Sequence, residues 1–202
     1  MTKFTIGSDP ECFIVNDKKK VISSIGLIPG EKGNPYRPED LPEGFGLETD
    51  NILAEFNIPA SDLFIGEIFV NNMLTMKEWL KNFLKEKDST YDVLCQASAV
   101  IDEDQLQSKE AQEIGCLVDY NVYTERPNNK PKKFEDNIRT TGVHIHVGYE
   151  NPNIGFSTAL VKYMDMFVGV PSVVYDHDTR RRKYYGNAGS FRLTSYGVKL
   201  SA

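Results

Sequence analysis

The stretch TTGVHIHVGY, residues 140–149, places two of the chain's three histidines one residue apart. Apolar residues alternate with His144 and His146, and Gly142 and Gly148 flank the run. Because successive side chains of a strand point to opposite faces, this period of two predicts a strand with one apolar face and one imidazole face. The partners of the imidazole face are therefore the first question about function.

The composition is that of a folded protein. The chain has 202 residues, of which 40% are hydrophobic and 11% aromatic, enough for one domain with a substantial core. A formal net charge of −6 argues against nucleic acid as a partner, because that affinity comes mostly from clustered Lys and Arg. Residues 176–199 nevertheless hold six Lys and Arg against two Asp, a local +4 that leaves −10 for the remainder. Such a segment suits a small anion such as the phosphates of a nucleotide.

The cysteines and the hydropathy indicate the compartment. Cys12, Cys95 and Cys116 are widely separated and form no C-x-x-C pair, which predicts neither a disulfide framework nor a cysteine zinc site. The sequence shows no charged and apolar leader, and no apolar run approaches the roughly 20 residues of a membrane span. We therefore expect a cytoplasmic protein with no membrane partner.

Several segments predict strands. Residues 4–15 predict a strand that a polar turn connects to a return strand near Val21. Four prolines and four glycines in residues 29–46 predict an irregular loop. Strand character resumes over residues 47–59, where Pro59 should stop it, and again over residues 91–101.

Two long amphipathic helices are expected to cover the strands. Ser61 can cap a helix that runs to about Lys87, since apolar residues recur there at helical spacing. A short helix is expected at 104–114 and a loop at 124–136. A second long helix should start near Ser157 and be interrupted by Pro171 or end close to it. This order predicts the α+β class, a mainly antiparallel sheet with covering helices, in a single domain over residues 1–202.

Acidic residues stand out in the predicted strands. Asp9 and Glu11 are two apart, so they share a face and lie about 6.6 Å apart along the strand. Pro10 between them lacks an N–H, which predicts an unpaired or bulged position. Glu55 is a further acid among apolar residues. The spacing suits two neighbouring ions about 3.5 to 4 Å apart, and oxygen-rich ligation favours Mg²⁺ or Mn²⁺ over zinc.

Each of these signals has a structural alternative. An H-x-H strand can present a polar face to solvent, Asp9 and Glu11 can be exposed strand charges, and the run RRRK can be a solvated turn. The occurrence of acids, imidazoles and arginines in one chain favours a shared site.

Together the segments resemble the phage-type amidoligase type 2 family, carboxylate-amine ligases related to the glutamate-cysteine ligases on the glutamine synthetase catalytic fold. The resemblance is carried by GSDPECF, DNILAEFNIPA, EIGCLVDYN, RTTGVHIHVGY and DTRRRKYYGNAGSFRLTSYG. It implies a glutamine synthetase-like, curved antiparallel sheet whose concave face binds ATP and divalent cations.

The resemblance also implies roles for residues at the matching positions. The implied metal ligands are Asp9, Glu11, Glu55 and His144. The implied nucleotide-binding residues are His146, Arg139 and Arg180. The implied catalytic residues, which neutralise the phosphates and the developing acyl phosphate, are Arg181, Arg182 and Arg192.

The chain departs from the family pattern at its end. After Tyr196–Gly197 the family continues into a strand with a glutamate and an arginine, whereas this sequence has Lys199 in place of the acid and ends at Ala202. The resemblance thus predicts that the last family strand is lacking and that the neighbouring metal site is weakened, because metal affinity depends on anionic ligands. Val118, where a proline is usual, is a milder difference.

Three functions follow as expectations. The first is an ATP- and Mg²⁺-dependent ligase that joins a small-molecule or peptide carboxylate to an amine through an acyl phosphate, in a bacterial host cytoplasm if the gene is a phage gene. The second is a catalytically impaired nucleotide- and metal-binding protein on the same scaffold. The third is a metal-dependent hydrolase that uses the H-x-H face. The sequence permits a homo-oligomer and does not specify the substrates.

Overall fold

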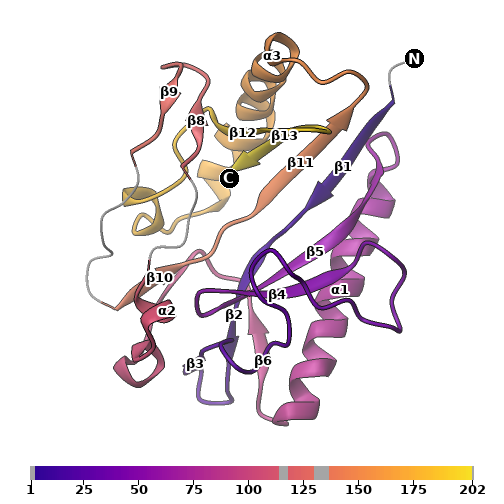
Figure 1. Cartoon of the computed structure of the whole chain (residues 1–202). Helices are drawn as coiled ribbons and strands as arrows, with labels where there is room; N and C mark the ends of the chain where they lie inside the picture. The colour runs from indigo at the N-terminus through magenta and orange to yellow at the C-terminus, as the bar shows by residue number, and fades with distance from the viewer. Residues whose placement is uncertain (1–2, 114–117, 130–136, 202) are drawn as a thin grey trace.

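The computed structural model describes residues 3–113, 118–129 and 137–201. Within these residues, eleven strands form one sheet in which every pairing is antiparallel. The strand order is β3-β2-β5-β1-β11-β13-β12-β8-β9, with β4 added to β5 and β6 added to β2. The expected α+β class with a large antiparallel sheet is confirmed (Figure 1).

The first predicted strand is broken in two. β1 (Phe4–Ser8) and β2 (Glu11–Val15) both pair with β5 (Leu53–Asp62), and the break falls at Asp9 and Pro10. The irregularity expected at Pro10 is therefore confirmed. The Pro10 carbonyl accepts a hydrogen bond from the Phe56 N–H at 3.1 Å, so the strand stays attached to β5 across the break.

The expected return strand is β3 (Val21–Ile22), which pairs with β2. Asn16 closes the turn between them, since its side chain accepts hydrogen bonds from the N–H groups of Lys18 and Lys20.

The single strand expected over residues 47–59, ending at Pro59, is not what the structure shows. β4 (Gly46–Asp50) and β5 are two arms of a hairpin, and β5 continues to Asp62. Pro59 is tolerated because the β1–β5 register shifts between the pairs Ser8–Ile58 and Ile6–Ser61, where no regular ladder bond is required of it. The irregular loop predicted before this hairpin contains only isolated bridges within residues 29–45.

Helix α1 (Gly66–Lys87) starts four residues later than a cap at Ser61 predicts, because its N-cap is Ile65. Ser61 is still part of β5, where it pairs with Ile6, so it cannot cap a helix. The buried face of α1 is formed by Met76, Leu80 and Leu84. These side chains pack in a core cluster with residues of β2, β4 and β5, namely Cys12, Ile14, Leu47, Ala54, Phe56 and Ile58.

The single strand expected at residues 91–101 is two strands. β6 (Asp92–Leu94) pairs with β2, whereas β7 (Ser98–Val100) pairs with β10 (Ile138–Thr140) in a separate two-stranded sheet. The expected helix at 104–114 is a 3₁₀ turn, η1 (Glu103–Leu106), followed by α2 (Lys109–Gln112), and its Ile114 end lies outside the described residues.

The expected loop at 124–136 begins with a short β-ladder. β8 (Tyr120–Asn121) pairs with β9 (Arg126–Pro127), and residues 130–136 lie outside the described part of the chain.

The H-x-H segment forms β11 (His144–Tyr149), as expected. It pairs with β1 on one side and with β13 (Gly197–Ser201) on the other, and β12 (Ser190–Thr194) follows β13. One face of these strands packs beneath helix α3 (Ile154–Met164) in a core of Val147, Val161, Met164, Phe191, Val198 and Leu200.

Helix α3 starts near the expected residue, with the Asn153 side chain accepting a hydrogen bond from the Phe156 N–H. A π-helical turn (Asp165–Gly169) and helix α4 (Val170–Tyr175) follow, with Pro171 in the first turn of α4. The interruption expected at Pro171 is confirmed, since proline cannot donate to the carbonyl one turn earlier. Across the described residues, no helix combines the length and apolarity needed to span a bilayer.

Candidate functional site

A cavity of about 440 Å³ lies where β2, β4 and β5 face β12, β13 and the segment around Arg181. Its volume falls in the usual range for small-molecule sites. Seven predicted site residues line it, namely Asp9, Glu11, Glu55, Arg139, His144, Arg181 and Arg192. His146, Arg180 and Arg182 are not among its lining residues.

Strand register arranges the charged side chains in two rows. Glu48 on β4, Glu55 on β5 and Glu11 on β2 are directly opposite one another on adjacent strands, and we call them the acid row. His146 on β11, Lys199 on β13 and Arg192 on β12 are aligned in the same way, and we call them the basic row. Apolar neighbours along these strands point to the other face, into the cores beneath α1 and α3; they include Leu47, Ala54, Cys12, Val147, Val198 and Phe191.

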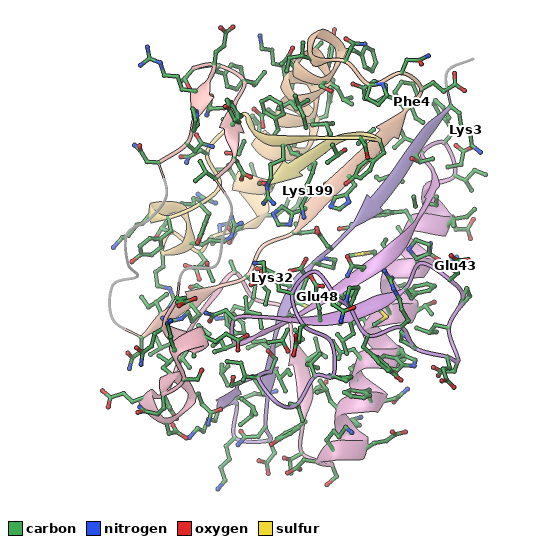
Figure 2. All side chains as sticks on the ribbon, in the orientation of Figure 1. Lys3, Phe4, Lys32, Glu43, Glu48 and Lys199 are labelled. Atoms are coloured by element: carbon green, nitrogen blue, oxygen red, sulfur yellow. The ribbon has the colours of Figure 1, made fainter. Side chains whose placement is uncertain are left out.

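Two residues of the acid row, Glu11 and Glu55, lie close enough to Asp50 of β4 to share a cation with it. Ligand oxygens of Glu11, Asp50 and Glu55 all lie within 4.8 Å of one another. Like charges directly opposite on adjacent strands are destabilising, so the row is unfavourable unless protons or a cation compensate it. Lys32 from the 29–45 loop reaches Asp50, with its Nζ 2.5 Å from Oδ2 (Figure 2).

Burial and mutual repulsion alter the acidity of this row. Burial, and then the charge of Asp50, raises the pKa of Glu11 to about 7, although the Gly142 N–H donates to its Oε2 at 2.7 Å. Burial, and then the charges of Glu11 and Asp9, raises the pKa of Glu55 to about 9. Without a cation, these carboxyls hold protons near neutral pH.

Asp9, in the break between β1 and β2, has a lowered pKa, unlike Glu11 and Glu55. Burial alone would raise its pKa, but hydrogen bonds from His144 and His146 outweigh burial and hold the pKa well below its usual range. His144 Nδ1 lies 3.0 Å and His146 Nε2 3.2 Å from the same Asp9 oxygen, Oδ1. The Lys199 ammonium contacts the other oxygen, Oδ2. The imidazole face predicted from the sequence is thus directed at Asp9.

The contacts of His144 define its tautomer. Its Nε2 lies 3.2 Å from the Arg192 guanidinium, which can only donate, so Nε2 accepts and Nδ1–H donates to Asp9. Burial lowers the pKa of His144, which agrees with a neutral ring. His146 is held similarly, with Tyr196 Oη 3.0 Å from its Nδ1 and the two rings stacked.

Three arginines reach the cavity. Arg192 donates from Nε to Asp119 at 2.5 Å. Arg181 donates from Nε to the Thr141 carbonyl at 2.7 Å, beside Glu11. Arg139 is buried and donates to the carbonyls of Ile138 and Ala111. Arg139 thus ties β10 to α2 as well as lining the cavity.

The other two predicted arginines make contacts elsewhere. Arg180 forms an ion pair with Asp178 at 2.9 Å. Arg182 donates to the carbonyls of Val173 and Asp176 at the end of α4. Their side chains stabilise the turn that presents Arg181.

Four further charged residues line the cavity and were not predicted from the sequence, namely Glu48, Asp50, Lys32 and Asp119. The signal for the first two was the segment LETDNILAEF: a turn at Asn51, whose φ is +57°, makes it a hairpin that sets Glu48 opposite Glu55. Lys32 and Asp119 come from irregular segments, which carry no periodic signal.

Comparison of the chain with protein-family models, with curated proteins and with solved structures gives no match. The resemblance to the amidoligases therefore stays a prediction carried by short motifs. The function has to be argued from the cavity itself.

Proposed function

We propose that the chain is an ATP- and Mg²⁺- or Mn²⁺-dependent ligase that joins a carboxylate to an amine, on a glutamine synthetase-like scaffold. The observation that carries this proposal is the division of one cavity between the carboxylates of the acid row and two cations of the basic row, Lys199 and Arg192. A polyphosphate bound with a divalent cation presents the complementary charges, because its oxygens need both metal and guanidinium partners.

The group of Glu11, Asp50 and Glu55 fits a hard divalent cation. Its oxygens come from carboxylates, which Mg²⁺ and Mn²⁺ prefer, so these three residues would hold the ion. Bound there, such an ion would supply charge neutralisation for phosphate oxygens. Protons that Glu11 and Glu55 otherwise retain would be released when it binds.

The opposite wall fits phosphates and the developing acyl phosphate. Arg181 and Arg192 are each fixed by hydrogen bonds to a backbone carbonyl or a carboxylate, so their guanidiniums are positioned before substrate binds. His144 orients Arg192 by accepting one of its N–H groups. Positioning and charge stabilisation are the main contributions a protein makes to phosphoryl transfer.

The proposed reaction has two steps and requires no protein nucleophile. The γ-phosphoryl group of ATP passes to the substrate carboxylate, giving ADP and an acyl phosphate, and an amine then displaces inorganic phosphate to form the amide. Cys12 is not a competing nucleophile, since its thiol is buried, burial raises its pKa, and it donates to the Ala54 carbonyl.

The experiment is a turnover assay. The protein is incubated with ATP, Mg²⁺ and pools of amino acids, peptides and polyamines, and release of ADP and phosphate is measured. Turnover is expected in the wild type and in Glu43→Gln, an exposed loop glutamate, and a loss of at least about 100-fold is expected in the Glu11→Gln, Glu55→Gln double variant. Failure to bind ATP in the presence of Mg²⁺ would overturn the proposal.

A second candidate function is a nucleotide- and metal-binding protein without turnover. The observation that favours it is the Lys199 contact with Asp9, which places a lysine against a residue that the resemblance implies as a metal ligand. Metal-dependent ATP binding with no ADP release from any pool would select this candidate. A hydrolase that uses His144 and His146 as metal ligands gains no support, because both rings are directed at Asp9.

A further inference from the structure

Asp9 lies where the acid row and the basic row meet. It is 4% exposed, and nitrogen donors already occupy both of its oxygens. Two imidazoles share Oδ1, and the Lys199 ammonium takes Oδ2. Coordination of a metal ion by Asp9 would therefore require at least one of these donors to leave.

His144 is engaged just as completely. Its Nδ1 donates to Asp9 and its Nε2 accepts from Arg192 at 3.2 Å, so neither ring nitrogen has a lone pair available for a metal. Of the four metal ligands predicted from the sequence, Asp9 and His144 are tied to nitrogen partners. Glu11 and Glu55 face Asp50 instead.

The sheet holds Lys199 in this position. Lys199 is the central residue of β13, which lies between β11 and β12, and its neighbours Val198 and Leu200 are buried in the core beneath α3. A residue on an interior strand cannot turn to the other face unless the register of the strand changes. Lys199 is thus held in the cavity wall (Figure 2), and Arg192 is its partner on β12.

We propose that the Lys199 ammonium is a resident cation that takes the place of a second divalent ion at Asp9. The cavity then takes metal only at the group of Glu11, Asp50 and Glu55, and it meets the nucleotide's phosphate oxygens on the other side with Lys199 and Arg192. A lysine ammonium is a compact point charge with three donors and is a common phosphate ligand. The identity of the nucleotide rests on the proposed function, whereas the number of metal sites can be measured without ATP.

The test counts the Mn²⁺ ions that the whole chain binds when Mn²⁺ is the only ligand, by electron paramagnetic resonance of the free ion. The wild type is expected to bind a single Mn²⁺. The Lys199→Glu variant is expected to bind a second, because the substitution removes the ammonium from Asp9 and adds a carboxylate. Lys199→Arg, which keeps the charge, should retain the single site. Lys3→Glu, the same charge reversal at an exposed residue before β1, is the matched control.

The outcomes separate the two proposals. Binding of two Mn²⁺ by the wild type overturns this inference and leaves the proposed function standing, and that count needs no variant. A single site in both the wild type and a folded Lys199→Glu variant also overturns it. The absence of any Mn²⁺ site in the wild type overturns the metal dependence of the proposed function itself.

A second measurement addresses the phosphates. Lys199→Met should weaken binding of a non-hydrolysable ATP analogue in the absence of metal by about tenfold, the effect of one lost charge-assisted contact. Unchanged affinity in a folded Lys199→Met variant would show that the ammonium does not contact the nucleotide and would overturn that part of the inference.

Discussion

The acid row and the basic row are built by the same device and differ in how their charges are balanced. Each consists of three residues aligned across adjacent antiparallel strands. The basic row is neutralised from within the fold, by Asp9 and Asp119. In the acid row, by contrast, burial and then the charges of neighbouring carboxylates raise the pKa values of Glu11 and Glu55. One side of the cavity is therefore balanced as folded, whereas the other leaves clustered carboxyl groups that a cation could balance.

The largest effect is expected from removing the counter-charge of the basic row. Asp9→Asn keeps the shape of the side chain but leaves the Lys199 ammonium, whose side chain is 15% exposed, without an anion. Loss of one partner of a buried pair costs about 3–5 kcal/mol, so we expect a cost near the lower limit, about 3 kcal/mol. Urea unfolding at neutral pH measures the free energy of unfolding. Asp17→Asn, at an exposed turn, is the control. A change below about 1 kcal/mol, the value of an exposed pair, would show that Asp9 is not needed to neutralise Lys199.

Removing a charge from the acid row is expected to increase the free energy of unfolding, the opposite of the effect of Asp9→Asn. Glu55→Gln removes one of several like charges, so at pH 9 the metal-free variant should be more stable than the wild type, by on the order of 1 kcal/mol. The same variant should bind Mn²⁺ at least about 10- to 100-fold more weakly. Chemical unfolding in EDTA and Mn²⁺ titration measure the two quantities. A Glu55→Gln variant that is less stable than the wild type at pH 9 would show that repulsion in the acid row does not destabilise the metal-free protein.

The pH dependence of stability provides a further test of the raised pKa values of Glu11 and Glu55. Glu11 and Glu55 have pKa values of about 7 and about 9 in the folded protein, against 4.5 for the unfolded chain, so the folded state binds more protons between these limits. Their contribution to stability is therefore complete below pH 4.5 and is lost as the pH rises through 7 and then 9.

In EDTA, the melting temperature should therefore fall as the pH rises from 4.5 to 9. Added Mg²⁺ should raise the melting temperature more at pH 9 than at pH 6. Mg²⁺ that stabilises equally at both pH values would indicate that it binds away from these glutamates.

The smallest effect is expected at Lys32, which contacts Asp50 from the loop. The lysine side chain is 48% exposed, and exposed pairs contribute about 0–1 kcal/mol. Lys32→Ala should therefore change metal-free stability little and raise Mn²⁺ affinity by no more than about fivefold, since it removes a competing cation. Isothermal titration with Mn²⁺ measures this change, and weaker Mn²⁺ binding in the variant would assign Lys32 a supporting role at the metal site.

The sequence predicted those features of the site that depend on the residues of a single strand. The alternation around His144 and His146 gave a strand with an imidazole face, and Pro10 gave the break that turns Asp9 into the cavity. The strand β13 with Lys199 was not expected, because its position between β11 and β12 depends on pairing with distant residues.

Pairing between segments also explains the other errors. Ser61 has the chemistry of a helix cap, but its pairing with Ile6 keeps it in β5. Glu48 and Asp50 join Glu55 only because residues 46–62 form a hairpin, and periodicity within one strand cannot indicate that turn. Arg180 and Arg182 could not be separated from Arg181 by sequence, since a short turn directs each of the three side chains differently.

We propose that a divalent cation binds to Glu11, Asp50 and Glu55 while phosphates bind beside Lys199 and Arg192. An anomalous difference map from crystals grown with Mn²⁺ and a non-hydrolysable ATP analogue tests both parts. We expect a manganese peak among the carboxylates of Glu11, Asp50 and Glu55, with phosphate oxygens beside Lys199 and Arg192. A manganese peak at Asp9 with Lys199 displaced, or no peak among the three carboxylates, would contradict it.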